Sequence, residues 1–358
     1  MDAKSREQTA PDQRISEAAK APRCGALTSH AHLNSILVIQ PGPLGSVVQA
    51  LPAVAALRQA HPLAEITWLI DPQFAPLLRG NSDVNHVHFL PSRQAPALGA
   101  PTGLLSWLKQ TRKMRPELAL DFQESLRSAL VAKASGARAI CGMSSAHFAG
   151  KIFYDRVTRV DGRSHAVERY LRLAESVGGA IGRELRWFIP SGDPLPRFQL
   201  QPPFVLLHPF ARGDSSLCNA AIEELCRALR PLRIVIAGHA RRRVPLIENA
   251  VDLTDQTSLL QVVWLVRAAR FVIAVQGGLI HLAAAMTPNL LSIHAWSDPR
   301  ATGPYNPDAW VWKQGRLLSV RELNQAQLPK RGRRFGPKDV SLVAELIRSR
   351  VSAGPAPA

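Results

Sequence analysis

The feature that most constrains this fold is a unit that recurs along the chain: a short aliphatic run, a turn, then a helix-length segment. In its first copy, Ser35–Ile39 is a run typical of a strand buried on both faces. The glycine-containing turn Gln40–Gly45 follows, with a helix from about Ser46 and a second strand at Glu65–Ile70. A strand, a helix and a parallel strand form a βαβ unit, so the sequence predicts an α/β fold with doubly wound sheets.

The same unit recurs on both sides of a proline-rich stretch, Pro190–Pro203, which is typical of an interdomain linker. Further strands are predicted at 87–90, 118–122, 139–142, 204–208, 233–238, 271–275 and 290–294. Helices are predicted at 104–113, 125–134, 165–177, 220–229, 259–269, 280–286 and 340–351. The predicted organisation is a disordered leader (1–33), a Rossmann-like domain (34–189), the linker (190–203), a second Rossmann-like domain (204–330), and a basic segment with a terminal helix and disordered tail (331–358).

Composition excludes several classes of protein. Apolar residues make up 46% of the 358, which excludes global disorder. No stretch reaches the length of a membrane-spanning helix, because Arg267 and Arg270 interrupt the best candidate, Val262–Val275. The four cysteines show no CxxC spacing, which disfavours a disulfide framework or a zinc ribbon. The chain is therefore interpreted as a reduced, soluble, cytoplasmic protein.

The net charge of +17 indicates an anionic partner: nucleic acid, a membrane surface or a phosphorylated substrate. An arginine-rich composition inherited from a GC-rich genome is the alternative explanation. Aromatic residues amount to only 6%, and neither zinc-finger spacing nor an aromatic-rich RNA-binding strand is present. We therefore expect no nucleic-acid partner.

Three loops are expected at the carboxyl ends of strands, where parallel sheets bind ligands. Gly42–Ser46 matches neither GxGxxG nor the P-loop, and is either an anion site or a tight turn capped by Ser46. Gln276–His281 is either a diphosphate site or a glycine pair that relieves helix–strand crowding, with His281 a ligand or a core histidine. Ser297–Tyr305 offers the carboxylate of Asp298 and a guanidinium.

Six motifs together carry a resemblance to one family. They are Ile36–Pro52 with its Leu-Gly, Asp121–Gln123 followed by Arg127-Ser128, His165–Arg169, Leu207–Pro209, Gly277–Ala285, and Ser297–Pro299 with Thr302–Tyr305. In this order they resemble the ADP-heptose:lipopolysaccharide heptosyltransferases, glycosyltransferase family 9, over about residues 35 to 350.

The resemblance implies a GT-B architecture, in which two Rossmann-like domains face a central cleft. It implies inverting transfer from ADP-heptose to an anionic lipopolysaccharide inner-core acceptor bearing Kdo, with no metal and no cofactor. The residues implied for donor binding are His208, Arg212, Ser215, Gln276, Gly277, Gly278, His281 and Asp298. Those implied for acceptor binding are Gly45, Gln123, Arg127 and Arg163. The leader and the basic run 330–334 either assist contact with the cytoplasmic face of the inner membrane or are simply solvated.

The chain departs from the family pattern at three polar positions. Ser46 stands where the family has the aspartate proposed as the base, and a serine hydroxyl has no useful basicity at neutral pH. Gln276 replaces another aspartate, and Ser215 or Ser216 replaces a lysine, for which Arg212 is a possible substitute. Asp121, at a strand end, is either a substitute base or a cap of the following turn.

Three hypotheses follow. The chain is an active heptosyltransferase-like enzyme with an unusual base, or a non-catalytic relative that binds a nucleotide-sugar or glycan. The third is a basic nucleic-acid or membrane-surface binder that reuses the fold.

Overall fold

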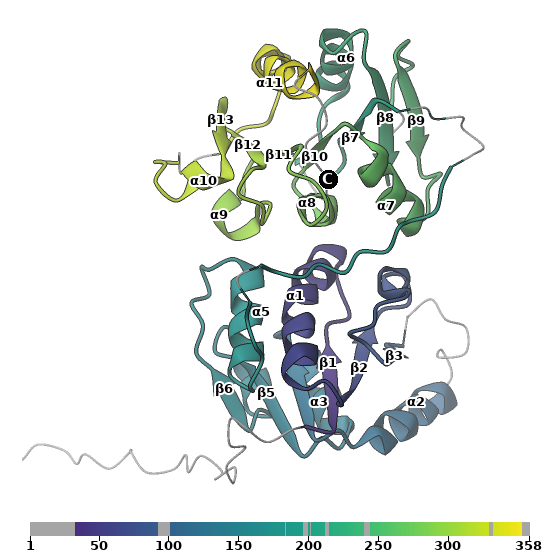
Figure 1. Cartoon of the computed structure of the whole chain (residues 1–358), viewed down its shortest axis with the longest axis vertical. Coiled ribbons are helices and arrows are strands. Elements are labelled where there is room, and N and C mark those ends of the chain that lie inside the picture. Colours follow the sequence, from purple (N-terminus) through teal and green to yellow (C-terminus); the bar gives the residue numbers. More distant parts are fainter. Residues whose placement is uncertain are drawn as a thin grey trace, which may run out of the picture.

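The computed structural model describes residues 33–91, 101–182, 184–195, 200, 202–211, 215–239, 244–328 and 332–352. Each half of the chain builds one sheet flanked by helices, and the two halves are stacked end to end (Figure 1). The predicted leader, except residue 33, and the predicted disordered tail lie outside the described residues.

The N-terminal sheet is parallel and has the order β3-β2-β1-β4-β5-β6. Its strands are β1 (Ser35–Ile39), β2 (Glu65–Ile70), β3 (His86–Phe89), β4 (Leu118–Asp121), β5 (Ala139–Met143) and β6 (Arg156–Thr158). Its helices are α1 (Leu44–Ala60), the 3-10 helix η1 (Ala75–Leu78), α2 (Pro101–Met114), α3 (Leu126–Ala134), α4 (Phe148–Lys151) and α5 (Ala166–Glu175). In the central register, Ile39 of β1 is paired with both Leu69 and Asp121.

The C-terminal sheet has the order β13-β12-β11-β10-β7-β8-β9 and is parallel except for β13. Its strands are β7 (Phe204–His208), β8 (Arg233–Gly238), β9 (Ala250–Thr254), β10 (Phe271–Val275), β11 (Leu290–Ile293), β12 (Trp310–Lys313) and β13 (Arg316–Ser319). Its helices are α6 (Asn219–Ala228), α7 (Leu259–Ala268), α8 (Gly278–Ala284), α9 (Pro299–Thr302), α10 (Val320–Leu323), the 3-10 helix η5 (Pro337–Asp339) and α11 (Val340–Ser352).

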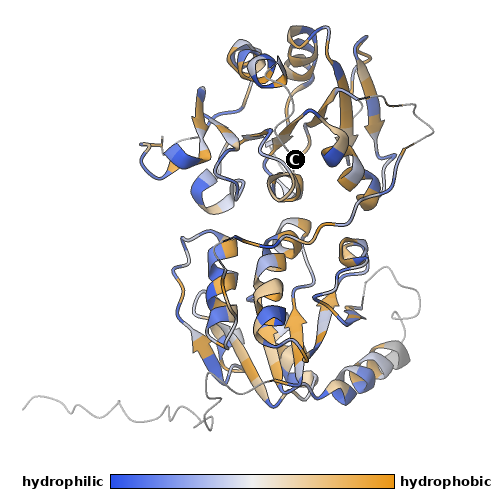
Figure 2. Cartoon of the chain, viewed as in Figure 1, coloured by the Kyte–Doolittle hydropathy of each residue, from blue (hydrophilic) through white to orange (hydrophobic). Residues whose placement is uncertain are grey.

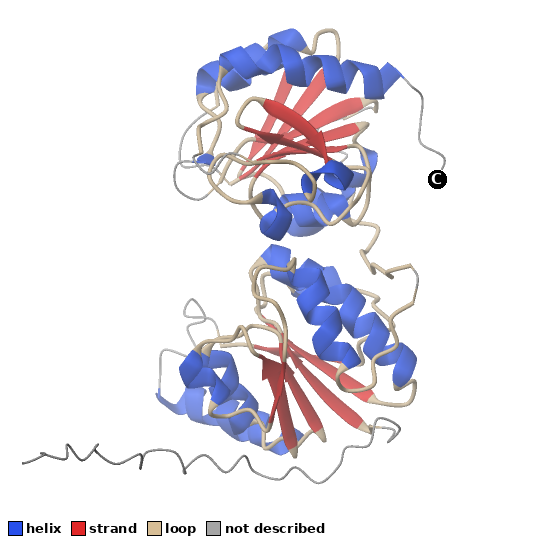
Figure 3. Ribbon diagram, turned by 90° about the vertical axis from the view of Figure 1, so that its left-hand side faces the viewer, coloured by secondary structure: helices blue, strands red, loops and turns tan. Residues whose placement is uncertain are grey.

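Strand alternation divides each sheet between two apolar layers. In β1, Ile36 and Val38 pack toward α1 and α5, whereas Leu37 and Ile39 pack toward α3. In β7, alternate residues likewise pack toward α7 and α8 or toward α6 and α11. Helices therefore cover both faces of each sheet, as Figure 3 shows, and the strands are predominantly hydrophobic in Figure 2. This is the doubly wound arrangement that the sequence predicts.

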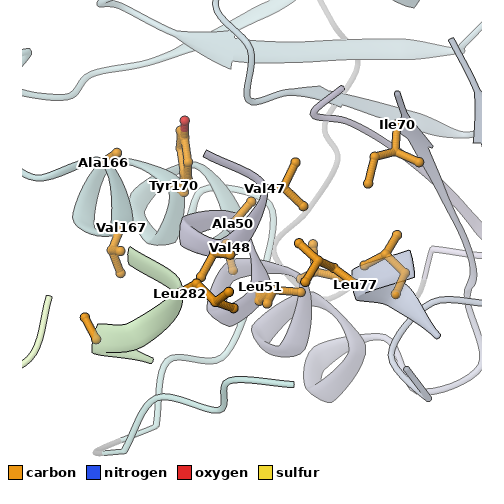
Figure 4. Packing of buried hydrophobic residues seen from close by; sticks show 14 of the residues in the cluster. Val47, Val48, Ala50, Leu51, Ile70, Leu77, Ala166, Val167, Tyr170 and Leu282 are labelled. Carbon is orange, nitrogen blue, oxygen red and sulfur yellow. The ribbon is translucent and has the colours of Figure 1, made fainter. Parts of the chain in front are cut away.

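The two halves share one apolar cluster where α1, α5 and α8 meet. Leu282 of α8, Val48 and Leu51 of α1 and Val167 of α5 lie close together in this cluster (Figure 4). Helix α1 is buried around much of its circumference because it contacts its own sheet, α5 and the other domain. Such a helix is expected to be apolar on all sides rather than amphipathic.

The segment between α5 and β7, which includes the predicted linker at 190–203, has no helix or strand among its described residues. Gly192 packs against the backbone of α7, where an added Cβ would lie 2.5 Å from the nitrogen of Trp264. The guanidinium of Arg267 donates to the carbonyl of Pro190 at 3.3 Å. The linker is thus held against the C-terminal domain. No helix within the described part of the chain is long and apolar enough to cross a membrane.

Candidate functional site

Helices α1 and α8 begin face to face, each against a glycine of the other. A Cβ on Gly45 would lie 2.5 Å from Cδ2 of His281, and one on Gly278 would lie 2.8 Å from Cβ of Leu44. The crowding that Gly278 relieves is therefore between the two domains, not between a helix and its own strand. At Gly277 the nearest atom to an added Cβ is the carbonyl oxygen of Val275, at 3.8 Å. Only Gly277 of the predicted glycine pair has open space beside it.

The His281 imidazole connects the two domains in a neutral form. The amide nitrogen of Gln49, in α1, donates to Nδ1 of His281 at 3.1 Å. Burial, with smaller contributions from His165 and His294, lowers the pKa of His281 to about 3. His281 therefore carries no charge near neutral pH, so it can hydrogen-bond a ligand but cannot neutralise a phosphate.

His165 makes a second connection between the domains. Its Nδ1 accepts from the backbone N–H of Val167 at 3.3 Å, and its Nε2 donates to the carbonyl of Gly303 at 3.1 Å. Its ring also lies 4.8 Å from that of Tyr305, centroid to centroid. Burial lowers the pKa of His165 to about 4. His165 opens one of the six motifs, and no role for it was predicted from the sequence.

Ser46 lies in the first turn of α1 beside a buried tyrosine. The side chain of Ser46 interacts with Tyr170, whose hydroxyl receives a hydrogen bond from Nε2 of Gln40 at 3.2 Å. Burial raises the pKa of Tyr170 to about 12, so the phenol stays protonated. The position that the family resemblance assigns to a base is therefore occupied by a neutral hydroxyl pair.

Asp121 is fully buried, and both of its carboxylate oxygens are occupied. Oδ1 accepts from the backbone N–H groups of Gln123 (2.9 Å) and Glu124 (3.2 Å), and Oδ2 accepts from the hydroxyls of Ser128 and Tyr154, each at 2.8 Å. Burial raises the pKa of Asp121 to about 6 despite these hydrogen bonds. Four donors from its own domain favour the second interpretation of Asp121, a cap that fixes the turn after β4.

Glu124, three residues further along that turn, was not identified from the sequence. Its backbone φ of 61° lies in the left-handed region, which glycine adopts readily and a glutamate seldom does. Its carboxylate pairs with Arg169 of α5 and accepts from the hydroxyl of Ser145. The side chains of Glu124 and Arg169 are only 16% and 17% exposed. The Glu124 side chain is thus held in one orientation at a position whose backbone conformation favours glycine.

Three buried polar atoms lie around this turn without a hydrogen-bond partner among the described residues: Oε1 of Gln40, Oε1 of Gln123 and Nε of Arg169. Most buried polar atoms in folded proteins are paired, so such a group marks a place where water or a ligand is expected. Gln123, proposed above as an acceptor residue, belongs to this group. The two arginines implied for acceptor binding, Arg127 and Arg163, are exposed.

In the C-terminal domain, His208 ends β7 and packs tightly against β8. A Cβ on Gly238 would lie 2.8 Å from the His208 ring, and burial lowers the pKa of His208 to about 4. The Ser216 hydroxyl is bonded to both the N–H and the carbonyl of Ala211, so it closes this loop, while Ser215 is half-buried beside it. Arg212 lies outside the described residues.

The ends of β10, β11 and β12 place the remaining predicted residues. Gln276 is half-buried, and its backbone N–H donates to the carbonyl of Ile293 at 3.0 Å. Asp298 is exposed and caps α9 by accepting from the N–H of Arg300 at 2.9 Å. Lys313, not identified from the sequence, is 3% exposed and donates to the carbonyls of Ala295 and Ser297. It therefore orders the loop that carries Asp298.

Within the part of the chain that the structure describes, no group of three His, Cys, Asp or Glu side chains could hold a metal ion. A surface hollow of about 400 Å³ lies between α6 and α11, lined in part by Glu224, Glu345 and Arg348. It contains none of the residues at the strand ends, so we do not assign the site there.

Two doubly wound domains that meet at the carboxyl ends of their strands form the GT-B arrangement of glycosyltransferases. The sequence model described as "Glycosyltransferase family 9 (heptosyltransferase)" matches residues 105–212 and 235–325. The chain belongs to this family.

Individual relatives agree. Lipopolysaccharide heptosyltransferase 1 of Salmonella typhimurium is 26% identical over 291 residues, which cover 75% of this chain and 91% of the relative. Among solved structures, ADP-heptose lipopolysaccharide heptosyltransferase II of E. coli superposes with a TM-score of 0.69 at 20% identity, covering 89% of this chain and 99% of that one. A family 9 glycosyltransferase of Veillonella parvula gives a TM-score of 0.70 at 15% identity, covering 91% and 100%. The GT-B fold is confirmed.

Proposed function

We propose that this chain transfers heptose from ADP-heptose to a Kdo-bearing inner-core acceptor of lipopolysaccharide. The observation that carries the proposal is family membership combined with the extent of the match, since the curated relative is covered over 91% of its length. The donor is proposed to bind the C-terminal domain and the acceptor the N-terminal domain. The donor residues proposed are those at the ends of β7, β10 and β11, among them His208, Gln276 and His281.

The reaction needs a group that accepts the proton of the attacking hydroxyl. The acceptor oxygen forms a bond to the anomeric carbon, the bond from that carbon to the diphosphate breaks, and ADP leaves. General-base assistance of this kind typically contributes 10²- to 10⁴-fold in rate. Ser46 cannot supply it, and the carboxylate of Asp121 is buried and occupied by four donors.

We assign the base to Glu124. Its ion-pair partner Arg169 lies over the ring of Tyr170, with the guanidinium carbon 6.0 Å from the ring centroid, and Tyr170 lies beside Ser46. Glu124 therefore belongs to the same cluster as the family's base position. Ser145 and Arg169 each contact one of its oxygens and orient it, but unlike the fully buried Asp121 its side chain is 16% exposed. Within the described part of the chain, the unpartnered oxygens of Gln40 and Gln123 are available for a polar ligand. The left-handed backbone at Glu124 is a cost that a side chain with a role explains.

The departing ADP carries negative charge that a cation would stabilise. Arg212 is the proposed cation, in place of the lysine expected where Ser215 or Ser216 stands. We propose that no metal and no cofactor takes part, as the resemblance implies. Because the acceptor is a glycolipid of the inner membrane, the proposed location is the cytoplasm, with contact at the cytoplasmic face of that membrane.

A specific observation favours a second function, binding without turnover. Ser46, Ser215 and Gln276 are all neutral, and Ser46 lies beside the protonated phenol of Tyr170. In that case the chain would bind ADP-heptose or a glycan and act beside an active relative.

Thermal denaturation with ADP and with ADP-heptose, followed by mass spectrometry of Kdo-lipid A after incubation, separates these functions. Ligand at about 100 times its Kd should stabilise the protein by about 2.7 kcal/mol and raise Tm by several degrees. The proposed enzyme shows this rise and adds one heptose to the acceptor. Binding without product supports the second function. If neither nucleotide raises Tm, both fail and a binder of membrane or nucleic acid remains.

A further inference from the structure

Helices α3 and α4 expose four large apolar side chains on the surface of the N-terminal domain, which we name the α3–α4 face. Leu126 and Leu130 of α3 are 40% and 48% exposed, and Phe148 of α4 and Ile152 just after it are 80% and 72% exposed. Each pair is spaced i, i+4, so its two members project from the same side of a helix. Surface leucines occur singly in most proteins, whereas a contiguous apolar group marks an interaction site.

The two helices pack directly against each other, so their exposed side chains form one surface. A Cβ on Gly150 of α4 would lie 3.6 Å from the Cβ of Ala129 and 3.4 Å from the carbonyl oxygen of Ser125. Gly150 is buried in this contact, while Phe148 and Ile152 flank it and point outward. The close approach at Gly150 therefore brings the apolar residues of α4 beside those of α3.

The charge around this face is basic. Arg127 and Lys133 are exposed on α3, Lys151 is half-exposed on α4, and neither helix contains an acidic residue. Residues 101–159 hold ten Lys and Arg against four Asp and Glu. Those four acids are engaged within the domain: Glu117 with Asn34, Asp121 with its four donors, Glu124 with Arg169, and Asp155 with the N–H of Ile140.

Apolar side chains ringed by lysine and arginine match an anionic bilayer, where apolar groups enter the interface and cations face the headgroups. Protein interfaces, in contrast, are depleted in lysine. We propose that the α3–α4 face docks this protein on an anionic phospholipid surface, with Phe148 and Ile152 as the inserted residues.

The α3–α4 face lies close to the proposed acceptor end of the site. α3 follows the carboxyl end of β4, and α4 follows the carboxyl end of β5, so both begin at the sheet edge that holds Glu124 and Gln123. A membrane at this face lies next to the proposed acceptor end of the site. This last step rests on the proposed function, whereas the docking itself does not.

The test is co-sedimentation of the full-length protein with vesicles of phosphatidylcholine alone or with about one third phosphatidylglycerol. The variant Phe148→Ser/Ile152→Ser is compared with Leu63→Ser/Leu246→Ser, whose residues are 94% and 105% exposed elsewhere. We expect the wild type and the control to bind anionic vesicles, and the first variant to bind at least about tenfold more weakly. Circular dichroism checks folding, and ADP-heptose thermal shifts report the proposed function independently.

Four results would overturn the proposal. The first is that the wild type does not bind anionic vesicles. The second is that the first variant binds as tightly as the wild type, which would assign binding to the basic run 330–334 or the leader. Alternatively, size-exclusion chromatography shows a wild-type dimer that the first variant abolishes, which would make the face a contact between copies. Equal binding of both variants at reduced affinity also contradicts it, because the effect would not be specific to this face.

Discussion

The two sheets end in different chemistry although their topology is alike. The N-terminal sheet ends in carboxylates, Asp121 and Glu124. The amide oxygens of Gln40 and Gln123 beside them have no hydrogen-bond partner within the part of the chain that the structure describes. Three strands of the C-terminal sheet, β7, β10 and β11, end in neutral groups: the imidazoles of His208 and His294 and the amide of Gln276.

This difference indicates that the two domains have different roles, proton acceptance in the N-terminal domain and ligand binding in the C-terminal domain. Groups able to accept a proton are retained in the N-terminal half, at the expense of a strained backbone at Glu124. In the C-terminal half, burial keeps histidines neutral, and Lys313 is tied to two backbone carbonyls. The described C-terminal strand ends thus shape a binding surface, and any cation for the diphosphate must come from elsewhere, such as Arg212.

The largest expected effect is acid destabilisation. Burial lowers the pKa of His165 and His208 to about 4, and that of His281 and His294 to about 3. Below pH 6.5 the unfolded chain binds protons that the folded chain does not, so stability falls as pH falls. Asp121, whose pKa is raised to about 6, acts in the opposite direction and offsets part of the loss.

We therefore expect the free energy of unfolding to drop by about 5 kcal/mol between pH 7 and pH 5. Urea denaturation at several pH values measures this directly. His281→Gln should flatten the dependence, and a stability that is level or rising toward pH 5 would contradict the assignment of these four histidines as neutral.

Removing the carboxylate of Asp121 should affect stability and spare turnover. Asp121→Asn loses charge-assisted bonds to Ser128 and Tyr154 and should cost about 1 to 3 kcal/mol of unfolding free energy. Transfer per folded molecule, measured below the new Tm, should stay within about threefold of wild type, because Asp121 does not act as the base. A loss of 100-fold or more in folded Asp121→Asn would return the catalytic role to this residue.

Substituting each glycine of the pair by alanine compares a position in the contact between the domains, Gly278, with a position that has space for a methyl group, Gly277. Gly278→Ala places a Cβ 2.8 Å from that of Leu44 and should cost about 1 to 3 kcal/mol, whereas Gly277→Ala should cost less than about 1 kcal/mol. Urea denaturation of both variants provides the measurement. Equal stabilities would mean that α1 and α8 do not pack as described.

The smallest expected effect is that of Ser46→Asp. With Glu124 present, a carboxylate at position 46 duplicates a base, so the transfer rate should change by less than about tenfold. A gain approaching the full 10²- to 10⁴-fold range of a general base, in a variant that binds ADP-heptose normally, would instead identify the wild type as a degenerate enzyme.

The sequence predicted the central strands well because they are buried on both faces and contain continuous aliphatic runs. It missed the edge strands β9 and β13, because they are partly exposed and lack such a run. It also missed the inner strand β12, because its four residues contain no aliphatic run and end in a lysine. The three-residue strand β6, at an edge of the N-terminal sheet, was missed because it is mostly exposed and too short to contain such a run.

The candidate site was predictable only where it follows a strand end. The loops after β1, β10 and β11 were expected to converge, and Gly45 does meet His281. Contacts such as Gln49 with His281, 232 residues apart, depend on domain packing that no local pattern encodes. Glu124 escaped notice because its left-handed backbone and its pairing with Arg169 appear only in three dimensions.

The most direct test of the central claim is heptose transfer to Kdo-lipid A by Glu124→Gln, assayed by mass spectrometry alongside an ADP-heptose thermal shift. Gln314→Gly, at another left-handed position with φ of 57°, is the matched control and should transfer as the wild type does. We predict a 10²- to 10⁴-fold slower transfer for Glu124→Gln with unchanged donor binding, and partial recovery in Ser46→Asp/Glu124→Gln. Transfer by Glu124→Gln at the wild-type rate would contradict the assignment of Glu124 as the base.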